Sequence, residues 1–168
     1  MLSGQFRVCR RVAVAAGLGL ALVSSPAAAQ QLSAPVSDRA RGAEQVVVGH
    51  VSSVTAIWRD NDFGDRLIVS VVHVIVDETL KGATQSGIDV EVEGGTIGSL
   101  TLRVSDLDTF ARGDRAVFYL QHNRRGGVIP HRRGLGLQKL DGAGRVDGSG
   151  MTLDQIRREV RAGASRQP

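Results

Sequence analysis

The chain has 168 residues, of which 42% are hydrophobic, 23% charged and 4% aromatic, and its formal net charge is +4. This composition excludes collagen, a long coiled coil, a small disulfide scaffold and a polytopic membrane protein. What remains is one small domain preceded by a distinct N-terminal segment.

Residues 1–29 have the three parts of an export signal. A basic start with three arginines is followed by an apolar run over 12–23 and by small residues at 26–29 that suit a signal peptidase. An apolar run of about a dozen residues is too short for a bilayer core, which needs roughly 20. We therefore expect cleavage after Ala29, no transmembrane anchor after cleavage, and a periplasmic or extracellular product. The general secretory (Sec) route is favoured, although Arg10-Arg11 leaves the twin-arginine route open.

Removal of this segment changes the charge and the cysteine count. It contains three of the 21 basic residues and none of the 17 acidic ones, so the net charge falls from +4 to +1. Cys9, the only cysteine, lies in it as well. The expected mature chain therefore offers no thiolate catalysis and no cysteine metal site. Its small net charge does not indicate nucleic-acid binding.

The mature chain divides into three parts. Residues 30–43 are rich in Ser, Ala, Pro and Arg without periodicity, which predicts a flexible leader. Residues 44–148 alternate β-branched runs with glycine-bearing turns, and residues 149–168 form a C-terminal helix and tail. Strands are predicted over 45–58, 66–79, 88–93, 100–104, 115–120, 127–130 and 134–140, with a hairpin turn over 141–146.

Three local patterns refine these elements. Gly49, inside the first strand, predicts a bulge or a tight bend. Both faces of 66–79 are apolar, which predicts a strand covered on both sides for much of its length. Thr152 and Gln155 form a capping box, and the stripe of Leu153, Ile156 and Val160 that follows predicts an amphipathic helix. Short strands punctuated by glycine favour a small antiparallel barrel.

Three segments carry a resemblance to a known family: VVVGHVSSV at 46–54, VIVDETLKG at 74–82 and GDRAVFYL at 113–120. Their order and spacing resemble the oligonucleotide/oligosaccharide-binding (OB) barrel of netrin modules and tissue inhibitors of metalloproteinases, as also found in exported bacterial proteins of unassigned function. The resemblance covers about residues 44–140. It implies a mainly β fold, a small antiparallel OB-like β-barrel with one C-terminal α-helix.

The chain departs from the animal inhibitors at the predicted mature end. There the resemblance implies an N-terminal cysteine that chelates the protease zinc, whereas this chain has Gln30 and no cysteine. The chelating mechanism does not carry over. A protease-inhibitor-like role would have to use a cysteine-independent surface.

Metal and cofactor sites are weakly indicated. Asp60, Asp62 and Asp65 concentrate carboxylates in one turn, as a hard cation prefers. However, the calcium-loop positions for glycine and glutamate hold Asp65 and Val71, so a solvated hairpin tip is the favoured interpretation. The four histidines, His50, His73, His122 and His131, lack the spacing of metal ligands. We expect no metal and no cofactor.

The candidate binding residues are basic and aromatic. Residues 124–133 contain four arginines, Arg124, Arg125, Arg132 and Arg133, which suit an anionic envelope polymer or an acidic protein face, the alternative being a solvated hairpin. Trp58 and Phe63 are candidate exposed anchors near the first hairpin. Only five aromatic residues follow position 29, too few for the stacking that single-stranded nucleic acid requires, so nucleic acid is not an expected partner.

Three function classes follow from these patterns. The favoured one is an exported, non-catalytic binding or interaction module for a protein or peptide. The second is the protease-inhibitor-like role. The third, a small hydrolase or metal-dependent enzyme, would need histidines and aspartates that converge in space, and no local motif predicts this convergence or any catalytic residue.

Overall fold

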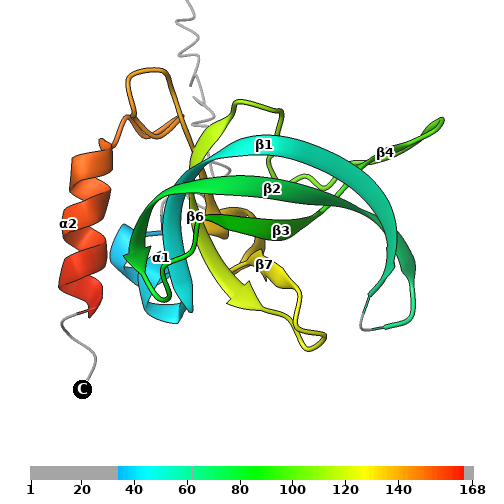
Figure 1. Ribbon diagram of the computed structural model, residues 1–168, viewed down its shortest axis with the longest axis horizontal. Coiled ribbons are helices and arrows are strands. Elements are labelled where there is room, and N and C mark those ends of the chain that lie inside the picture. The colour runs from blue at the N-terminus through cyan, green and yellow to red at the C-terminus, as the bar shows by residue number, and fades with distance from the viewer. Residues whose placement is uncertain (1–33, 62, 165–168) are drawn as a thin grey trace, which may run out of the picture. The chain divides into compact units, whose positions relative to one another are not determined.

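The computed structural model describes residues 34–61 and 63–164 (Figure 1). The expected export signal at 1–29 lies outside the described residues, as do 30–33 of the expected leader, Asp62 and 165–168. In chain order the elements are α1 (Val36–Gly42), β1 (Gln45–Asp60), β2 (Arg66–Lys81), β3 (Gly87–Glu93), β4 (Gly95–Ile97), β5 (Leu100–Leu102), β6 (Arg115–His122), β7 (Val128–Pro130), the 3-10 helix η1 (Arg133–Gly136), β8 (Leu137–Leu140) and α2 (Leu153–Ala164).

Five strands close a barrel in the order β1-β2-β3-β7-β6 and back to β1. Every neighbouring pair is antiparallel except β3 and β7, which run parallel and share the single pair Val90–Val128. β8 extends the sheet beyond β6, and β4 with β5 forms a separate hairpin. The mainly β, OB-like barrel with a C-terminal helix confirms the predicted fold class.

The first two strands are long and strongly curved (Figure 1). Each has 16 residues, and their pairing shifts register three times, once between Val48 and Gly49. A Cβ at Gly49 would lie 2.5 Å from the carbonyl oxygen of Ile75. The predicted bulge is therefore present, and glycine is required there because the two backbones approach so closely.

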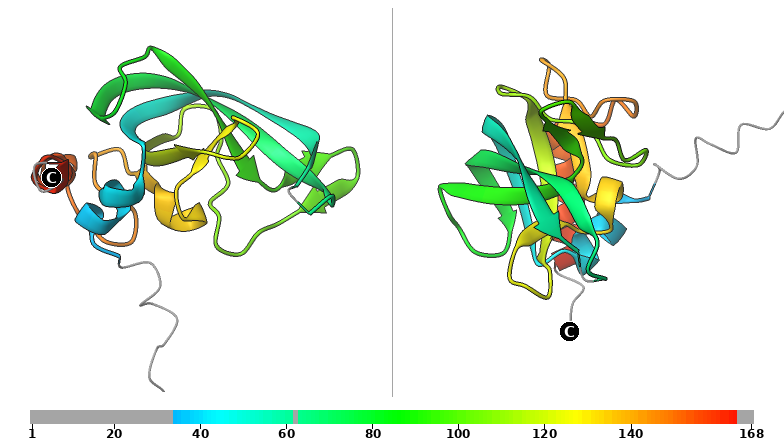
Figure 2. Two further views of the ribbon diagram at one scale, coloured as in Figure 1. Left: turned by 90° about the horizontal axis from the view of Figure 1, so that it is seen from below. Right: turned by 90° about the vertical axis from the view of Figure 1, so that its right-hand side faces the viewer.

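Alternate residues of β6 face two different cores. Ala116, Phe118 and Leu120 point into the barrel, where they meet apolar residues of β1, β2 and β3. Val117 and Tyr119 point outward to a second core that α1 and α2 cover, and Figure 2 shows both helices on this side of the sheet. Because successive side chains of a strand point to opposite faces, β6 contributes to the barrel interior with one set of residues and to the helix-covered outer core with the other.

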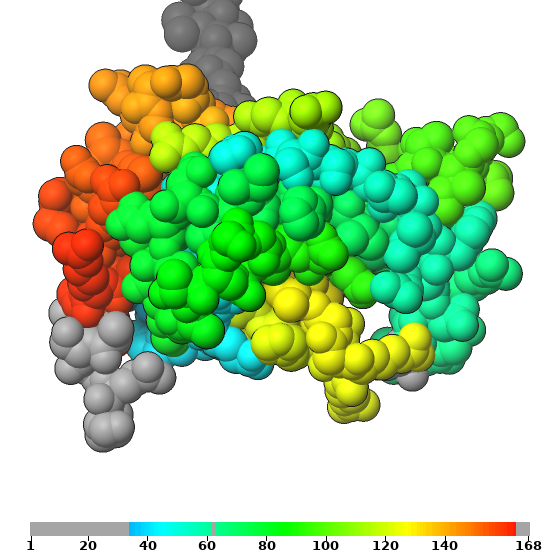
Figure 3. Space-filling view, in the orientation of Figure 1, coloured from blue at the N-terminus to red at the C-terminus, as the bar shows by residue number. Residues whose placement is uncertain are grey.

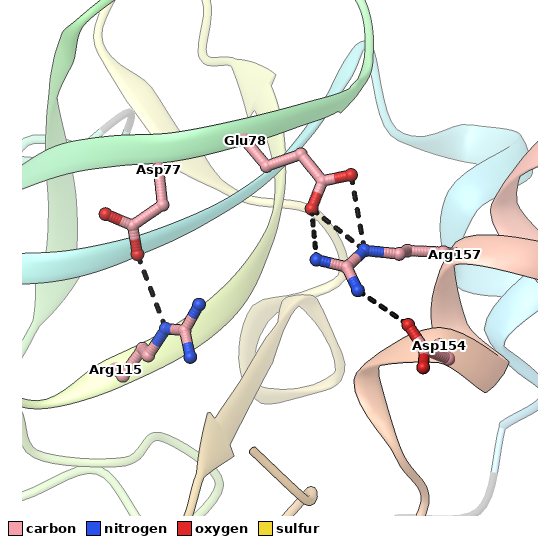
Figure 4. Close-up of polar contacts among 5 residues, drawn as sticks. All are labelled: Asp77, Glu78, Arg115, Asp154 and Arg157. Atoms are coloured by element: carbon pink, nitrogen blue, oxygen red, sulfur yellow. Dashed lines mark hydrogen bonds and ion pairs between the residues drawn. The ribbon is translucent and has the colours of Figure 1, made fainter.

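Helix α2 begins and docks as its sequence predicts. The backbone N–H of Gln155 donates to Thr152 Oγ1 (3.3 Å), and that of Thr152 donates to Gln155 Oε1 (2.8 Å), which completes the capping box. The predicted stripe is buried. On the polar side, Arg157 Nη2 donates to Glu78 Oε2 of β2 (2.6 Å) and Nη1 donates to Asp154 (2.6 Å), as Figure 4 shows.

Helix α1 corrects the expectation of a flexible leader for residues 36–42 of the predicted segment 30–43. Its residues Val36 and Ala40, with Ala43 just beyond, are at most 2% exposed against the outer core. Arg39 is also buried, and its guanidinium donates to the carbonyl oxygens of Ala34 (3.0 Å) and Leu135 (2.5 Å). The spacing of 36, 40 and 43 is helical, but a helix this short gains its stability only by docking.

Lys81, at the end of β2, holds the C-terminus of α1. Its ammonium donates to the carbonyl oxygens of Ala40 (2.8 Å) and Ala43 (2.7 Å). These carbonyls have no partner within the helix, and a cation at this end also complements the helix dipole.

Three further expectations need correction. The outer face of β2 is covered only in part: Val69 is buried, but His73 is exposed and Ile75 is 40% exposed. The strand expected over 134–140 is divided into η1 and the shorter β8. The strand expected over 100–104 ends at Leu102, where its pairing with the three-residue strand β4 also ends.

Replacement of Arg39 tests whether α1 is an integral part of the fold. We expect Arg39→Ala to lower the free energy of unfolding by roughly 2–3 kcal/mol, because two partly buried carbonyls lose their charged donor and the buried side chain is lost from the contact between α1 and the barrel. The matched control is Arg41→Ala in the same helix, where the side chain is 62% exposed and the cost should be below about 0.5 kcal/mol. Urea unfolding of both variants measures the difference, and equal effects would contradict the docked helix.

Protonation of His131 should destabilise the fold. Burial lowers the pKa of His131 from its ordinary 6.5, and the charges of Arg132 and Lys81 act in the same direction. The unfolded chain then binds this proton more readily than the folded one. The contribution of neutral His131 to the free energy of unfolding is therefore complete above about pH 6.5 and is lost as the pH falls. NMR titration should give a His131 midpoint below 6.5, and His131→Gln should flatten the decline in stability between about pH 6.5 and 5. A midpoint at or above 6.5 would refute this.

Candidate binding groove between two hairpins

A concave feature lies between two hairpin turns, the β1–β2 turn at 60–65 and the β6–β7 turn at 123–127. A cleft of about 400 Å³ separates them, and Figure 3 shows the opening between the teal and yellow segments. A recess of about 490 Å³ continues it along β3. We call the two together the hairpin groove. Both parts are lined by Arg59, Glu91, Gly126 and Gly127.

The β1–β2 turn is held by one asparagine. Asn61 Oδ1 accepts hydrogen bonds from the backbone N–H groups of Phe63 (2.9 Å) and Asp65 (2.8 Å). The backbone N–H of Asn61 donates to the carbonyl oxygen of Asp65 (2.8 Å). Because an asparagine side chain can replace a backbone acceptor in a tight turn, Asn61 links the described residues of this turn to one another.

The β6–β7 turn uses the same arrangement. Asn123 Oδ1 accepts from the backbone N–H groups of Arg125 (2.9 Å) and Gly127 (2.9 Å). Gly126 between them has φ +81°, a left-handed conformation that glycine adopts without strain. Both walls of the groove are therefore internally hydrogen-bonded turns.

Arg125 joins the two turns. Its guanidinium donates to the carbonyl oxygens of Asp60 and of Asn61, the latter at 2.8 Å. The contact spans about 65 positions of sequence and could not be found from local patterns. It fixes the distance between the two walls at the mouth of the groove.

Two carboxylates of the groove, Glu91 and Glu93, are held in ion pairs. Arg59 donates to Glu91 Oε1 through Nη2 (2.6 Å) and Nε (3.1 Å), and the Glu91 side chain is only 19% exposed. Farther along β3, Glu93 pairs with Arg133 (3.1 Å), which also donates to Asp106 (3.1 Å). The hydrogen bond to Asp106 is the main cause that raises the pKa of Arg133. The groove thus presents alternating charges and no uniform positive field.

The four arginines of the predicted basic stretch occupy two places. Arg124 and Arg125 lie in the β6–β7 turn, whereas Arg132 and Arg133 follow β7 with left-handed φ values of 55° and 57°. Arg125 and Arg133 already have the partners described above. Their role in binding an anionic partner stays a prediction.

The two predicted aromatic anchors are both exposed. Trp58 on β1 is 39% exposed and carries the guanidinium of Arg66 over its ring, 5.4 Å from the centroid. Phe63, in the β1–β2 turn, is 91% exposed. Trp58 does not belong to the barrel core, where Phe118 is buried and stacks obliquely on Phe110.

The carboxylates of the β1–β2 turn were the weak metal candidates. Asp65 Oδ2 accepts from Asn61 Nδ2 (3.1 Å), so it serves the turn itself. Asp60 is exposed, and Asp62 lies outside the described residues. Within 34–61 and 63–164, no group of three or more His, Cys, Asp or Glu residues is placed to hold a metal ion.

Each histidine has a separate partner. His50 contacts Asp77 (2.9 Å), His73 contacts Asp89 (2.6 Å), and His122 contacts Glu44 (2.6 Å), which lowers the Glu44 pKa through the hydrogen bond. His131 contacts Gln121. Among the described residues, only His122 lines the groove, at the end remote from Asp60.

Comparison of the chain with protein-family models and with curated proteins finds no match. Among the helices of the described residues, none has the length and apolar character needed to cross a membrane.

Removal of the Arg125 contact should loosen both turns without unfolding the barrel. In Arg125→Ala we expect faster amide hydrogen exchange in segments 60–65 and 123–127 and a stability loss of at most about 1 kcal/mol, because the side chain is exposed. Arg124→Ala, its neighbour in the same turn, is the control and should leave exchange unchanged. Hydrogen exchange followed by mass spectrometry compares the two. Unchanged exchange in Arg125→Ala would show that the walls are not coupled.

Proposed function

We propose that this chain is an exported, non-catalytic binding module that holds an extracytoplasmic protein or peptide in the hairpin groove. The observation that carries the proposal is the pair of ordered turns joined by Arg125. They flank β2 and β3, and OB-type barrels bind their ligands on this face, between the first turn and the turn joining the fourth and fifth strands. In this chain those turns are 60–65 and 123–127.

The lining of the groove supports a polypeptide ligand. Apolar side chains of Leu67, Val69 and Ile129 line the groove together with Asn61 and Asn123. Such a surface matches a peptide, whose main chain needs hydrogen-bond partners and whose side chains need apolar contacts. No Phe, Tyr or Trp side chain lines the groove in the described part of the chain, which disfavours base stacking. The paired carboxylates of Glu91 and Glu93 disfavour a purely anionic polymer.

The export part of the proposal rests on the sequence of residues 1–29. The basic start, the short apolar run and the alanine-rich end together indicate a cleaved signal. The mature protein would then meet its partner in the periplasm or outside the cell.

Partner capture with a groove variant tests the proposal. The bait is residues 30–168, applied to envelope and culture-supernatant fractions of the producing cells, with heat-unfolded bait as the blank. We expect one protein to be enriched on folded bait and its binding to fall at least tenfold in Arg59→Gln/Glu91→Gln. This variant removes the central ion pair of the groove.

The matched control is Asp77→Asn/Arg115→Gln, which removes an exposed ion pair outside the groove (Nε–Oδ2, 3.3 Å; Figure 4). It should bind within about twofold of the unaltered protein. Equal capture by the groove variant, or enrichment of an anionic polymer without protein, would refute the proposed site. If the captured protein is a protease and the bait lowers its activity, the module acts as an inhibitor.

A further inference from the structure

The second half of β1 has an open edge. Residues 45–50 pair with β6 on one side of the strand, and the backbone of Val51 still exchanges hydrogen bonds with residues 113–114. Over 53–60 the strand pairs with β2 alone, and no other strand of the described residues runs along its far side. The β4–β5 hairpin meets this ribbon on a face and not on the edge, since a Cβ at Gly95 would lie 3.2 Å from that of Ala56.

The hydrogen bonds of the β1–β2 turn determine which backbone groups face the open edge. The backbone N–H of Asn61 donates to the carbonyl oxygen of Asp65 (2.8 Å), so 61 and 65 form a hydrogen-bonded pair. Because such pairs alternate along an antiparallel ladder, odd-numbered residues of 53–59 direct their backbone groups toward β2. The N–H and C=O groups of Val54, Ala56 and Trp58 are therefore directed to the open edge, where only another β-strand can match them in a row.

The open stretch ends at Trp58 because a side chain occupies the next outward position. The carbonyl oxygen of Asp60 accepts a hydrogen bond from the Arg125 guanidinium. Between Val51 and this contact lies the segment 53–58, with the sequence SVTAIW.

This segment lacks the features by which proteins prevent strand association. Edge strands are commonly protected by lysine, by proline, by a bulge or by an inward-facing charge. Residues 53–58 contain no charge, no proline and no glycine. Two of their apolar side chains are exposed, Val54 at 36% and Trp58 at 39%. The edge is therefore suited to accept a strand.

The segment is complementary to a second copy of itself. When two copies run antiparallel with Ala56 at the two-fold axis, Val54 of each copy lies opposite Trp58 of the other. These positions all have outward-directed backbone groups, so the two copies meet in hydrogen-bonded pairs. On the opposite face Thr55 lies opposite Ile57 of the second copy, and β-branched pairs of this kind stabilise sheets.

The charges at the ends of the segment do not oppose this pairing. Arg59, which is paired with Glu91, falls opposite Ser53 of the second copy. Asp60, with Arg125 bound to its carbonyl oxygen, falls at the level of residue 52, another serine. No like charges therefore face each other directly across the axis.

We propose that the chain forms a symmetric dimer in which β1 of one copy pairs antiparallel with β1 of a second copy over residues 54–58. The two β1–β2 ribbons then make one continuous sheet, and the exposed apolar side chains of Val54 and Trp58 cover each other. None of residues 54–58 lines the hairpin groove, so the dimer stands or falls independently of the proposed function.

Disulfide trapping tests the register. The full chain is prepared with Thr55→Cys or with Ile57→Cys, with Cys9→Ser in every sample, and the two variants are mixed under reducing conditions and then oxidised. We expect a disulfide-linked dimer in the mixture and at least tenfold less in either variant alone, because only positions 55 and 57 are direct neighbours. The control mixture pairs Ile57→Cys with Thr101→Cys, on exposed β5. An absent crosslink, or equal crosslinking in the control, overturns the proposal.

Sedimentation velocity over a concentration series tests the dimer itself. Thr55→Lys/Ile57→Lys sets lysine against lysine across the axis and should weaken dimerisation at least tenfold. The matched control, Ser99→Lys/Thr101→Lys in the β4–β5 hairpin, adds the same charge at exposed positions and should dimerise within about twofold of the unaltered protein.

A second variant serves if the lysine variant does not fold. Ala56→Pro removes an N–H that the pairing with β2 does not use, and proline is tolerated on edge strands, so the fold should persist while the dimer is lost. A chain that is monomeric at every concentration overturns the proposal, as does a dimer that neither variant weakens. A complex with a different protein on this edge, in place of the dimer, also overturns it.

Discussion

The structure depends on how β1 shares its hydrogen bonds between two neighbours. Residues 45–50 pair with β6 and close the barrel, while residues 46–60 pair with β2. Only the first part of β1 forms hydrogen bonds with both β6 and β2. The strand bends at Gly49, and beyond residue 50 it pairs with β2 alone. The hairpin groove lies between this second half of the β1–β2 hairpin and the shorter β6–β7 hairpin.

The outer face of the barrel needs a cover where β1 and β6 are apolar on both sides. Helices α1 and α2 provide it, and a buried polar contact lies beneath them: Tyr119 Oη donates to Gln138 Oε1 (2.7 Å). Burial raises the pKa of Tyr119, so the phenol keeps its proton and remains a donor throughout the physiological range. Arg39, Tyr119 and Gln138 are polar groups that an apolar pattern does not predict, and their satisfied hydrogen bonds make the helix-covered face specific.

The sequence predicted those features that arise within a few residues. The residues at 115–120 predicted strand β6, Thr152 and Gln155 predicted the start of α2, and Gly49 predicted the bulge. It could not predict contacts that only the closed barrel creates. Arg125 meets Asp60 and Asn61 from the opposite hairpin, and Lys81 reaches the end of α1 across about 40 positions. Helix α1 was not predicted because so short a helix is stable only when its few apolar residues pack in a core, here the one that contains Val46 and Val48.

The two walls of the groove use the same chemistry, which bears on what the groove can discriminate. Asn61 and Asn123 each accept hydrogen bonds from two backbone N–H groups of their own turn. These hydrogen bonds form without a ligand. The central charges are also neutralised before binding by the pair between Arg59 and Glu91. A ligand therefore gains little from bulk charge and must match fixed donors, acceptors and apolar positions. Selectivity in such a site comes from shape and hydrogen bonding inside the groove.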